Sequence, residues 1–154
     1  MRANAVMTRN VIYVVPRQTL REAWETMQLF SIRHLPVLDD TSLVGVVSDR
    51  DVLRWSTVGA GGELEVPERE VGAVMTPVPI TCHPASTLCE VIDTMLGRHI
   101  DCLPVVDGAG TLVGIVTTTD LLALLRDRES QRRNPLPFEW CVVDGVAPPP
   151  AAAI

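Results

Sequence analysis

The sequence predicts an α+β fold built from two copies of one β-α-β-β-α unit. Three observations support this prediction: residues 5–53 are matched by residues 73–122, both copies carry helix-start signals at equivalent positions, and both contain paired runs of β-branched residues. One such unit leaves an apolar sheet face that it cannot bury alone. We therefore expect the two copies to pack into a single domain with an internal pseudo-two-fold axis.

The internal repeat consists of short strings that recur in the same order. The register shifts by one residue in the turn before Leu43 and Leu112, where a surface turn absorbs an insertion most easily. The recurring strings are Ala-Val-Met-Thr (5–8 and 73–76), Leu-Pro-Val (35–37 and 103–105) and Leu-Val-Gly followed by two β-branched residues (43–47 and 112–116).

Each unit begins with an expected strand and a capped helix. Residues 11–15 are rich in β-branched side chains, which predicts the first strand. The pairs Thr19/Glu22 and Thr87/Glu90 have the spacing of a capping box, in which each side chain satisfies a free amide at a helix start. Apolar residues at helical spacing follow each pair and predict a helix there.

Two short strands and a second helix complete each unit. Residues 35–38 and 43–47 predict strands around a polar turn, and the second copy places its turn at residues 107–110. A second helix is expected after Ser48 and after Thr117.

These elements divide the chain into four segments. Arginines beyond residue 126, followed by Phe138 and Trp140, fit either a polar helix end or an arm that docks on a second subunit. The proline- and alanine-rich end is typical of disorder. The predicted segments are unit one (1–56), a glycine-containing linker (57–68), unit two (69–127) and a partly disordered C-terminal tail (128–154).

Composition narrows the classes of partner. The 154-residue chain carries a net charge of −6, and all 13 of its basic residues are arginine. Such a chain does not attract a long nucleic acid over its whole surface, so an anionic ligand must meet a locally positive pocket. We find no secretory segment and no apolar run of the ~20 residues needed to span a membrane. The four cysteines lack CxxC spacing, which favours a reduced cytoplasmic protein.

The order of these motifs resembles the CBS motif, twice over, across about two thirds or more of the chain. The resemblance implies a tandem pair of β-α-β-β-α units, often called a Bateman module, which here would stand alone. Such modules commonly bind AMP, ADP, ATP or related adenosyl compounds such as S-adenosylmethionine between their halves. They regulate an attached or separate protein, and commonly form a disc-shaped homodimer.

The resemblance assigns ribose recognition to Ser48 and Asp51 and to Thr117 and Asp120. A ribose diol presents two hydroxyl donors, and a carboxylate offers two acceptor oxygens. The same residues also fit a capping box at the start of the second helix of each unit. Both roles can hold at once.

The resemblance also indicates phosphate contacts at Arg33 and His34, in one cleft with the ribose residues of the second unit. Arginine offers a forked donor set for phosphate, and histidine adds charge when it is protonated. The alternative is a solvated turn with an exposed arginine. Arg50 and Arg9 are further phosphate candidates, although Arg50 could equally be an exposed residue of a first helical turn.

The two clefts are expected to be unequal. Asp101 and Cys102 stand in the second unit where Arg33 and His34 stand in the first, and a carboxylate repels phosphate. The cleft with Asp120 should therefore take a nucleotide. The cleft built from Ser48, Asp51 and Asp101 should be empty or take a ligand with little negative charge. Apolar walls for adenine are available, although such residues are more often plain core: Ile12, Val37, Ile80 and Val105.

The function that the sequence predicts is a non-enzymatic ligand-sensing module with no required cofactor. The alternative is a structural dimerisation or interaction module whose clefts are empty. An enzyme would need a nucleophile, base and orienting group, and none forms a recognisable set. Cys82-His83 and the pair His99 and Cys102 offer too few ligands for a closed zinc site. The expected partners are a small adenosyl ligand, a second copy of the chain and a regulated protein of unknown identity.

Overall fold

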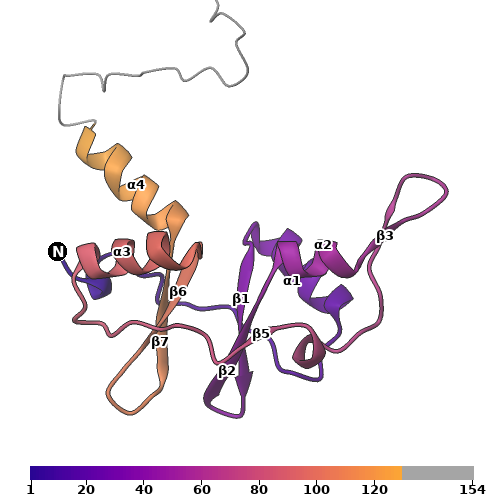
Figure 1. The fold of residues 1–154 in the computed structure, drawn as a ribbon, viewed down its shortest axis with the longest axis horizontal. Coiled ribbons are helices and arrows are strands. Elements are labelled where there is room, and N and C mark those ends of the chain that lie inside the picture. The colour runs from indigo at the N-terminus through magenta and orange to yellow at the C-terminus, as the bar shows by residue number, and fades with distance from the viewer. Residues whose placement is uncertain (130–154) are drawn as a thin grey trace, which may run out of the picture.

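The computed structural model describes residues 1–129, and the predictions for the tail, including Phe138 and Trp140, lie outside the described residues. Two similar units stand side by side, each with its helices toward one end of a strand pair (Figure 1). The two-unit α+β prediction is confirmed. The elements are short 3-10 helices at Ala3–Ala5 and Val71–Ala73, helices α1 (Leu20–Phe30), α2 (Asp49–Trp55), α3 (Leu88–Arg98) and α4 (Thr118–Glu129), and strands β1 (His34–Asp39), β2 (Ser42–Ser48), β3 (Thr57–Val58), β4 (Leu64–Glu65), β5 (Thr76–Pro77), β6 (Cys102–Val106) and β7 (Leu112–Thr117).

The predicted strand pairs and helix caps are present in both units. Strand β1 pairs antiparallel with β2, and β6 pairs antiparallel with β7, each pair with a register shift at the equivalent position. Helices α1 and α3 both start with a complete capping box, formed by Thr19/Glu22 and Thr87/Glu90. The two units therefore share their local irregularities as well as their elements.

The prediction of a full strand at residues 11–15 is wrong in extent. Only Val14 pairs, through a parallel bridge to Val37. The pairing stops there because the next amide, that of Val15, donates to the side chain of Gln18 (2.9 Å) and turns the chain toward α1. The second unit has the same single bridge, between Cys82 and Val105.

The first residues of each unit cross over to the other unit. Thr8 pairs with Ile115 of β7 through two backbone hydrogen bonds of 2.9 and 3.0 Å. Strand β5 pairs in the equivalent way with Gly45 and Val46 of β2. The N-terminus accordingly lies beside α3, at the far unit (Figure 1). Each strand pair is thus extended by chain from the opposite half of the sequence.

The crossing segments also complete the two cores. In the first core, Val66 and Val71 join residues of the first unit, and in the second core Ala3 and Met7 join residues of the second. The first core consists of Val14, Leu20, Ala23, Met27, Leu35, Val37, Val47, Val52, Val66 and Val71, and the second of Ala3, Met7, Val91, Met95, Leu103, Val105 and Val116.

Two glycines allow the crossing segments to approach the strands closely. A Cβ at Gly114 would lie 2.6 Å from Sδ of Met7 and 3.1 Å from the carbonyl oxygen of Thr8. A Cβ at Gly45 would lie 2.4 Å from Sδ of Met75. The separations from the two methionine sulfurs are far below van der Waals contact, so a Cβ at either position would force the packed methionine to move.

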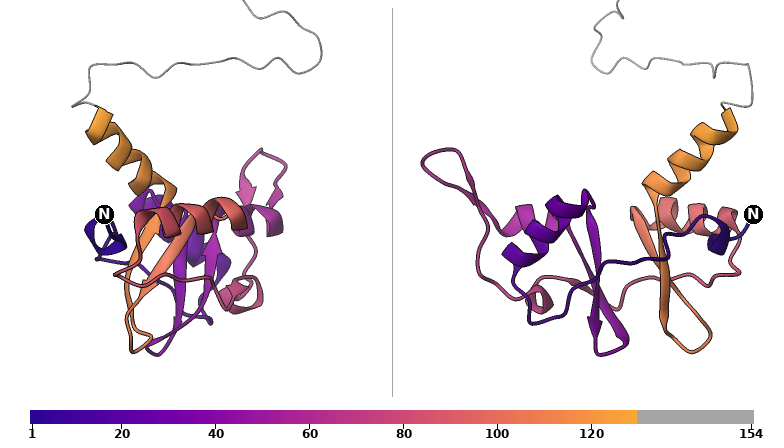
Figure 2. Two further views of the ribbon diagram at one scale, coloured as in Figure 1. Left: turned by 60° about the vertical axis from the view of Figure 1, so that its left-hand side comes forward. Right: turned by 180° about the vertical axis from the view of Figure 1, so that it is seen from behind.

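The predicted linker, residues 57–68, forms a hairpin of strands β3 and β4 that projects from the first unit (Figure 2). The chain after it is tied to α1, because Glu68 accepts a 2.6 Å hydrogen bond from Nε of Arg21. The Arg69 guanidinium stacks over the ring of Trp55, 4.0 Å from its centre. None of the helices within residues 1–129 is long and apolar enough to cross a membrane.

Candidate nucleotide site

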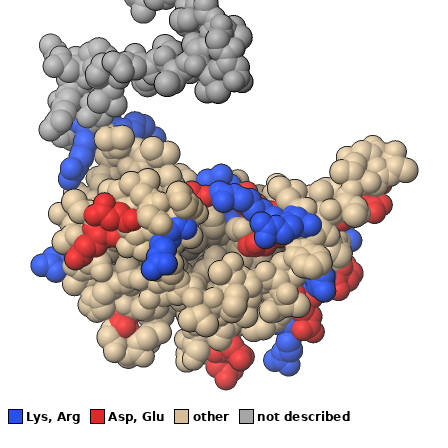
Figure 3. All heavy atoms as spheres, in the orientation of Figure 1, with Lys and Arg blue, Asp and Glu red and all other residues tan. Residues whose placement is uncertain are grey.

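Two clefts lie along the seam between the units. The first has a volume of about 220 Å³ and the second about 340 Å³. Basic and acidic side chains lie next to one another on the face that crosses this seam (Figure 3). The linings correspond almost position for position: Thr8, Ile12, Pro36, Thr117 and Asp120 in the first cleft match Thr76, Ile80, Pro104, Ser48 and Asp51 in the second.

The first cleft brings together the four residues that the sequence assigned to one nucleotide. Arg33 lies just before β1 and His34 begins it, while Thr117 and Asp120 come from the end of β7 and the first turn of α4. Both units thus contribute to the lining of this cleft. Thr8, from the crossing N-terminal segment, adds a hydroxyl that sequence reasoning missed.

The two oxygens of the Asp120 carboxylate have different hydrogen-bond partners. Its Oδ2 accepts hydrogen bonds from the backbone N–H and the hydroxyl of Thr117, both at 2.7 Å. Among residues 1–129, its Oδ1 accepts only a 3.5 Å hydrogen bond from the Thr8 hydroxyl. The capping interpretation therefore holds for Oδ2. Because Oδ1 retains lone pairs, the same carboxylate can accept ribose hydroxyls in the cleft.

Asp51 repeats this arrangement in the second cleft. Its Oδ2 accepts from the N–H and the hydroxyl of Ser48, at 2.9 and 2.7 Å, and a complete capping box begins α2. Chemically, the acceptors of the two clefts are equivalent. Any difference in ligand preference must therefore come from the cations and apolar walls around them.

His34 lines both clefts, and its burial favours the neutral imidazole. Burial lowers its pKa below the ordinary value of 6.5, and the Asp49 and Asp101 carboxylates only partly oppose this effect. At pH 7 the imidazole can donate a hydrogen bond to phosphate, while Arg33 supplies the positive charge of the first cleft.

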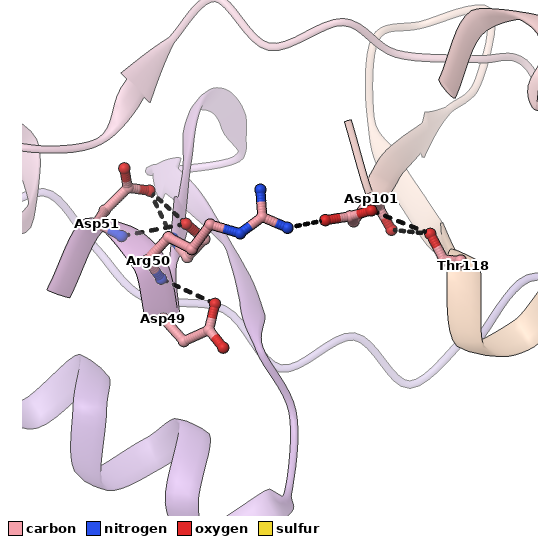
Figure 4. Close-up of polar contacts among 6 residues, drawn as sticks. Asp49, Arg50, Asp51, Asp101 and Thr118 are labelled. Carbon is pink, nitrogen blue, oxygen red and sulfur yellow. Dashed lines mark hydrogen bonds and ion pairs between the residues drawn. The ribbon is translucent and has the colours of Figure 1, made fainter. Parts of the chain in front are cut away.

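The charges of the second cleft differ from the sequence expectation. Asp101 lines both clefts rather than the second alone. Arg50, a phosphate candidate, lines the second cleft and not the first. Arg54 also lines the second cleft. Arg50 forms an ion pair with Asp101, shown in Figure 4. The second cleft is therefore not purely acidic.

Two of the four predicted adenine walls are wrong. Ile12 and Ile80 line the first and second cleft, but Val37 and Val105 are fully buried in the two cores. The physical reason is strand alternation: in β1 and β6 the neighbouring residues Pro36 and Pro104 turn toward the clefts instead. That alternation was available in the sequence.

Two weaker predictions can also be placed. The Arg9 guanidinium donates to the carbonyl oxygen of Asn4 at 3.0 Å, and Arg9 lines neither cleft. Within residues 1–129, no group of three or more histidine, cysteine or acidic side chains is placed to hold a metal ion.

Comparison with known families identifies the repeated unit. The sequence model of the CBS domain matches residues 3–57 and 71–127, which is most of the chain. The chain belongs to the CBS-domain family. Its two matched regions are the two CBS motifs of one pair, as the internal repeat predicted.

Curated relatives of this CBS pair are of two kinds. The CBS domain-containing protein YhcV of Bacillus subtilis is 34% identical over 125 residues, which cover 80% of this chain and 85% of YhcV. An inosine-5'-monophosphate dehydrogenase of Korarchaeum cryptofilum is 37% identical over 120 residues, or 78% of this chain but only 23% of the enzyme. The chain thus spans about a quarter of the dehydrogenase, within its CBS region. These matches agree with a non-catalytic CBS pair.

Solved CBS pairs share the same fold. The structure of CBSX2 in complex with AMP has a TM-score of 0.70 and 29% identity, covering 82% of this chain and 98% of that one. The CBS domain pair of protein MJ0100 in complex with 5-methylthioadenosine and S-adenosyl-L-methionine has a TM-score of 0.69 and 25% identity, covering 81% and 99%. Both structures hold adenosyl ligands.

Proposed function

We propose that this CBS pair is a ligand-sensing regulatory module of the cytoplasm, which binds an adenine nucleotide or adenosyl compound in its first cleft. One observation carries the proposal: Arg33 and His34 of the first motif face Thr117 and Asp120 of the second across a single cleft. This set offers a cation for phosphate and a carboxylate for ribose. The AMP and S-adenosylmethionine complexes of the related pairs support the same ligand class.

Ligand binding at this place can act as a signal because both motifs supply contacts. A ligand that touches both halves favours the packing in which its contacts are best satisfied. A partner protein, or a second copy of the chain, that prefers one packing then responds to ligand concentration. The second cleft lacks Arg33, and its Arg50 is engaged by Asp101 in an ion pair, so we propose that it binds phosphate-bearing ligands more weakly.

Isothermal calorimetry against AMP, ADP, ATP and S-adenosylmethionine tests the proposal. We expect micromolar binding of at least one of them, weakened strongly by Asp120→Asn and less by the matched variant Asp51→Asn. Both variants retain a side-chain oxygen that can cap the helix, so we expect both to fold. A difference in their ligand affinities then reports on the clefts. Equal loss from the two variants would contradict the assignment of the first cleft. Absence of binding in folded wild-type protein would contradict ligand sensing.

The second candidate function is a ligand-free dimerisation module, and exposed apolar helix residues favour it. Leu29 is 77% exposed and Leu96 69% exposed, on helices α1 and α3, and Leu122 on α4 is 60% exposed. Exposed apolar side chains on three helices offer contact area for a partner, for which a second copy is the simplest choice. Light scattering measures the mass directly. A dimer that binds none of the four ligands would favour this candidate over the sensor.

A further inference from the structure

The Arg50–Asp101 ion pair joins the two CBS motifs across the seam (Figure 4). Arg50 lies in the first turn of α2 in the first motif, and Asp101 lies just before β6 in the second. Asp101 also forms hydrogen bonds within its own motif, where its carbonyl oxygen accepts from the backbone N–H of Thr118 at 3.0 Å. The Asp101 carboxylate also lies 3.5 Å from the Thr118 hydroxyl. Its position is therefore fixed by the second motif, while its charge is balanced by the first.

The two partners of this pair face different clefts. Asp101 lines both clefts, whereas Arg50 lines the second and not the first. While the pair is closed, the guanidinium offsets the negative charge that Asp101 presents to the first cleft. When the pair opens, Arg50 no longer offsets that charge, which then acts on the cleft where Arg33 and His34 would bind phosphate.

The Arg50–Asp101 ion pair is exposed to solvent and can be broken by a competing anion. The Arg50 side chain is 67% exposed and Asp101 32% exposed, so solvent screens their attraction. A phosphate in the second cleft competes for the same forked donors with two or more charged oxygens. Within residues 1–129 the opposite half has no equivalent pair, because the residue that corresponds to Arg50 is Thr119, which is short and uncharged. In this part of the chain Arg33, the counterpart of Asp101, forms no such ion pair across the seam.

We propose that the Arg50–Asp101 pair couples the two clefts, so that an anionic ligand which draws Arg50 into the second cleft weakens phosphate binding in the first. This coupling rests on the proposed nucleotide-sensing function, to which it adds that a ligand in one cleft lowers the affinity of the other. Because coupling free energies are reciprocal, phosphate in the first cleft weakens anion binding in the second by the same factor. Two phosphate ligands thus bind with negative cooperativity.

The test measures AMP binding to the first cleft by calorimetry, in an Asp51→Asn background that disables the ribose acceptor of the second. Adding Arg50→Gln imitates the open pair, and we expect about fivefold weaker AMP binding although Arg50 does not line the first cleft. Adding Asp101→Asn to that variant should restore the affinity. The matched control is Arg54→Gln, on the same helix and in the same cleft, whose residue forms no ion pair with Asp101 within the described chain.

Two results would overturn the coupling. One is an equal loss from Arg50→Gln and Arg54→Gln, which would show a general charge effect. The other is the absence of recovery on adding Asp101→Asn. If wild type binds none of the nucleotides, the proposed function fails, and the coupling is then measured without ligand. The readout is the NMR titration of His34, whose charged neighbours are Asp49, Asp101, Arg33 and Arg50.

In this ligand-free form, Arg50→Gln should raise the pKa of His34, because it removes a cation and leaves the Asp101 charge uncompensated. Adding Asp101→Asn should lower the pKa again, and Arg54→Gln should move it less than Arg50→Gln does. An unchanged His34 titration in Arg50→Gln would refute the coupling whatever the nucleotide results.

Discussion

The hydroxyl of Thr8 lies 3.5 Å from Oδ1 of Asp120, although 112 residues separate them in the chain. The contact exists because the N-terminal segment crosses to the second motif and pairs with β7. The floor of the first cleft is therefore assembled from both ends of the CBS pair. Ligand affinity should depend on this crossing as well as on the residues of the second motif.

The first prediction concerns the ribose. Asp120→Asn should weaken AMP binding about 10-fold or more, because a hydrogen bond to a charged acceptor contributes about 1.5–3 kcal/mol. A 2'-deoxy ligand should bind wild type less well, since it leaves the carboxylate partly unpaired. Calorimetry with both ligands measures this. Equal affinities for ribose and deoxyribose nucleotides would show that Asp120 does not contact the diol.

The second prediction concerns the close approach of Met7 to β7. Gly114→Ala should destabilise the protein by about 1–3 kcal/mol, because the new methyl group meets the Met7 side chain and the backbone of Thr8. Gly97→Ala is the control: this glycine lies in helix α3, and its Cβ would meet nothing within 4 Å. Since alanine favours a helix interior, the control should be neutral or stabilising. Urea denaturation measures both, and equal effects would argue against the crossing.

The third prediction concerns pH. Burial lowers the pKa of His34 below its unfolded value of 6.5, so the unfolded chain binds more protons as pH falls. The free energy of unfolding is therefore unaffected by His34 protonation above pH 6.5, and it should decline as the pH falls below that value. His34→Gln should flatten this part of the stability profile. Denaturation midpoints from pH 7.5 to 5.5 provide the measurement, and identical slopes for variant and wild type would contradict it.

The fourth prediction concerns thiol reactivity. Burial, with a smaller effect from the Asp101 carboxylate, raises the pKa of Cys102 to about 12. Almost no thiolate is present at pH 8, so iodoacetamide should spare Cys102 in the folded protein and modify it after denaturation. Cys89, which is exposed, serves as the internal control. Peptide mapping by mass spectrometry measures both sites, and equal labelling rates in native protein would disprove the burial of Cys102.

The fifth prediction concerns backbone strain beside the second cleft. Val78 has a φ of 47°, a left-handed conformation that is costly for a β-branched residue, and its side chain is 88% exposed. Val78→Asn should raise the free energy of unfolding by about 1 kcal/mol, or the Tm by about 2–4 °C. Val58→Asn, at an exposed position in β3, should give no such gain. A Tm for Val78→Asn at or below wild type would contradict the strain.

Local patterns in the sequence predicted the elements well because each has a local cause. The capping boxes at Thr19 and Thr87 depend on residues three positions apart, and the repeat gave every element a second, independent instance. The first strand was overestimated because β-branched composition does not reveal that a side chain, Gln18, takes the next amide.

The candidate site was only partly predictable because it depends on contacts across the seam. The resemblance to the CBS motif correctly grouped Arg33 with Asp120, yet no local pattern shows that Asp101 reaches both clefts or that Arg50 reaches Asp101. The error at Val37 is different in kind. Successive side chains of a strand point to opposite faces, so the sequence already indicated that Val37 faces away from the cleft if Pro36 faces toward it.

The crossing of Met1–Thr8 into the second motif has a consequence for biosynthesis. During translation the N-terminal half emerges first. The first core becomes complete only when Val66 and Val71 have left the ribosome, and Ala3 and Met7 must remain unpaired until the second motif is made. A nascent chain therefore carries this N-terminal segment, with the apolar side chains of Ala3 and Met7, before its docking site on the second motif exists. In a polysome, strand β7 of a neighbouring nascent chain can bind this segment instead. Exchange of the N-terminal segment between copies is therefore the form of misfolding that we expect for this fold.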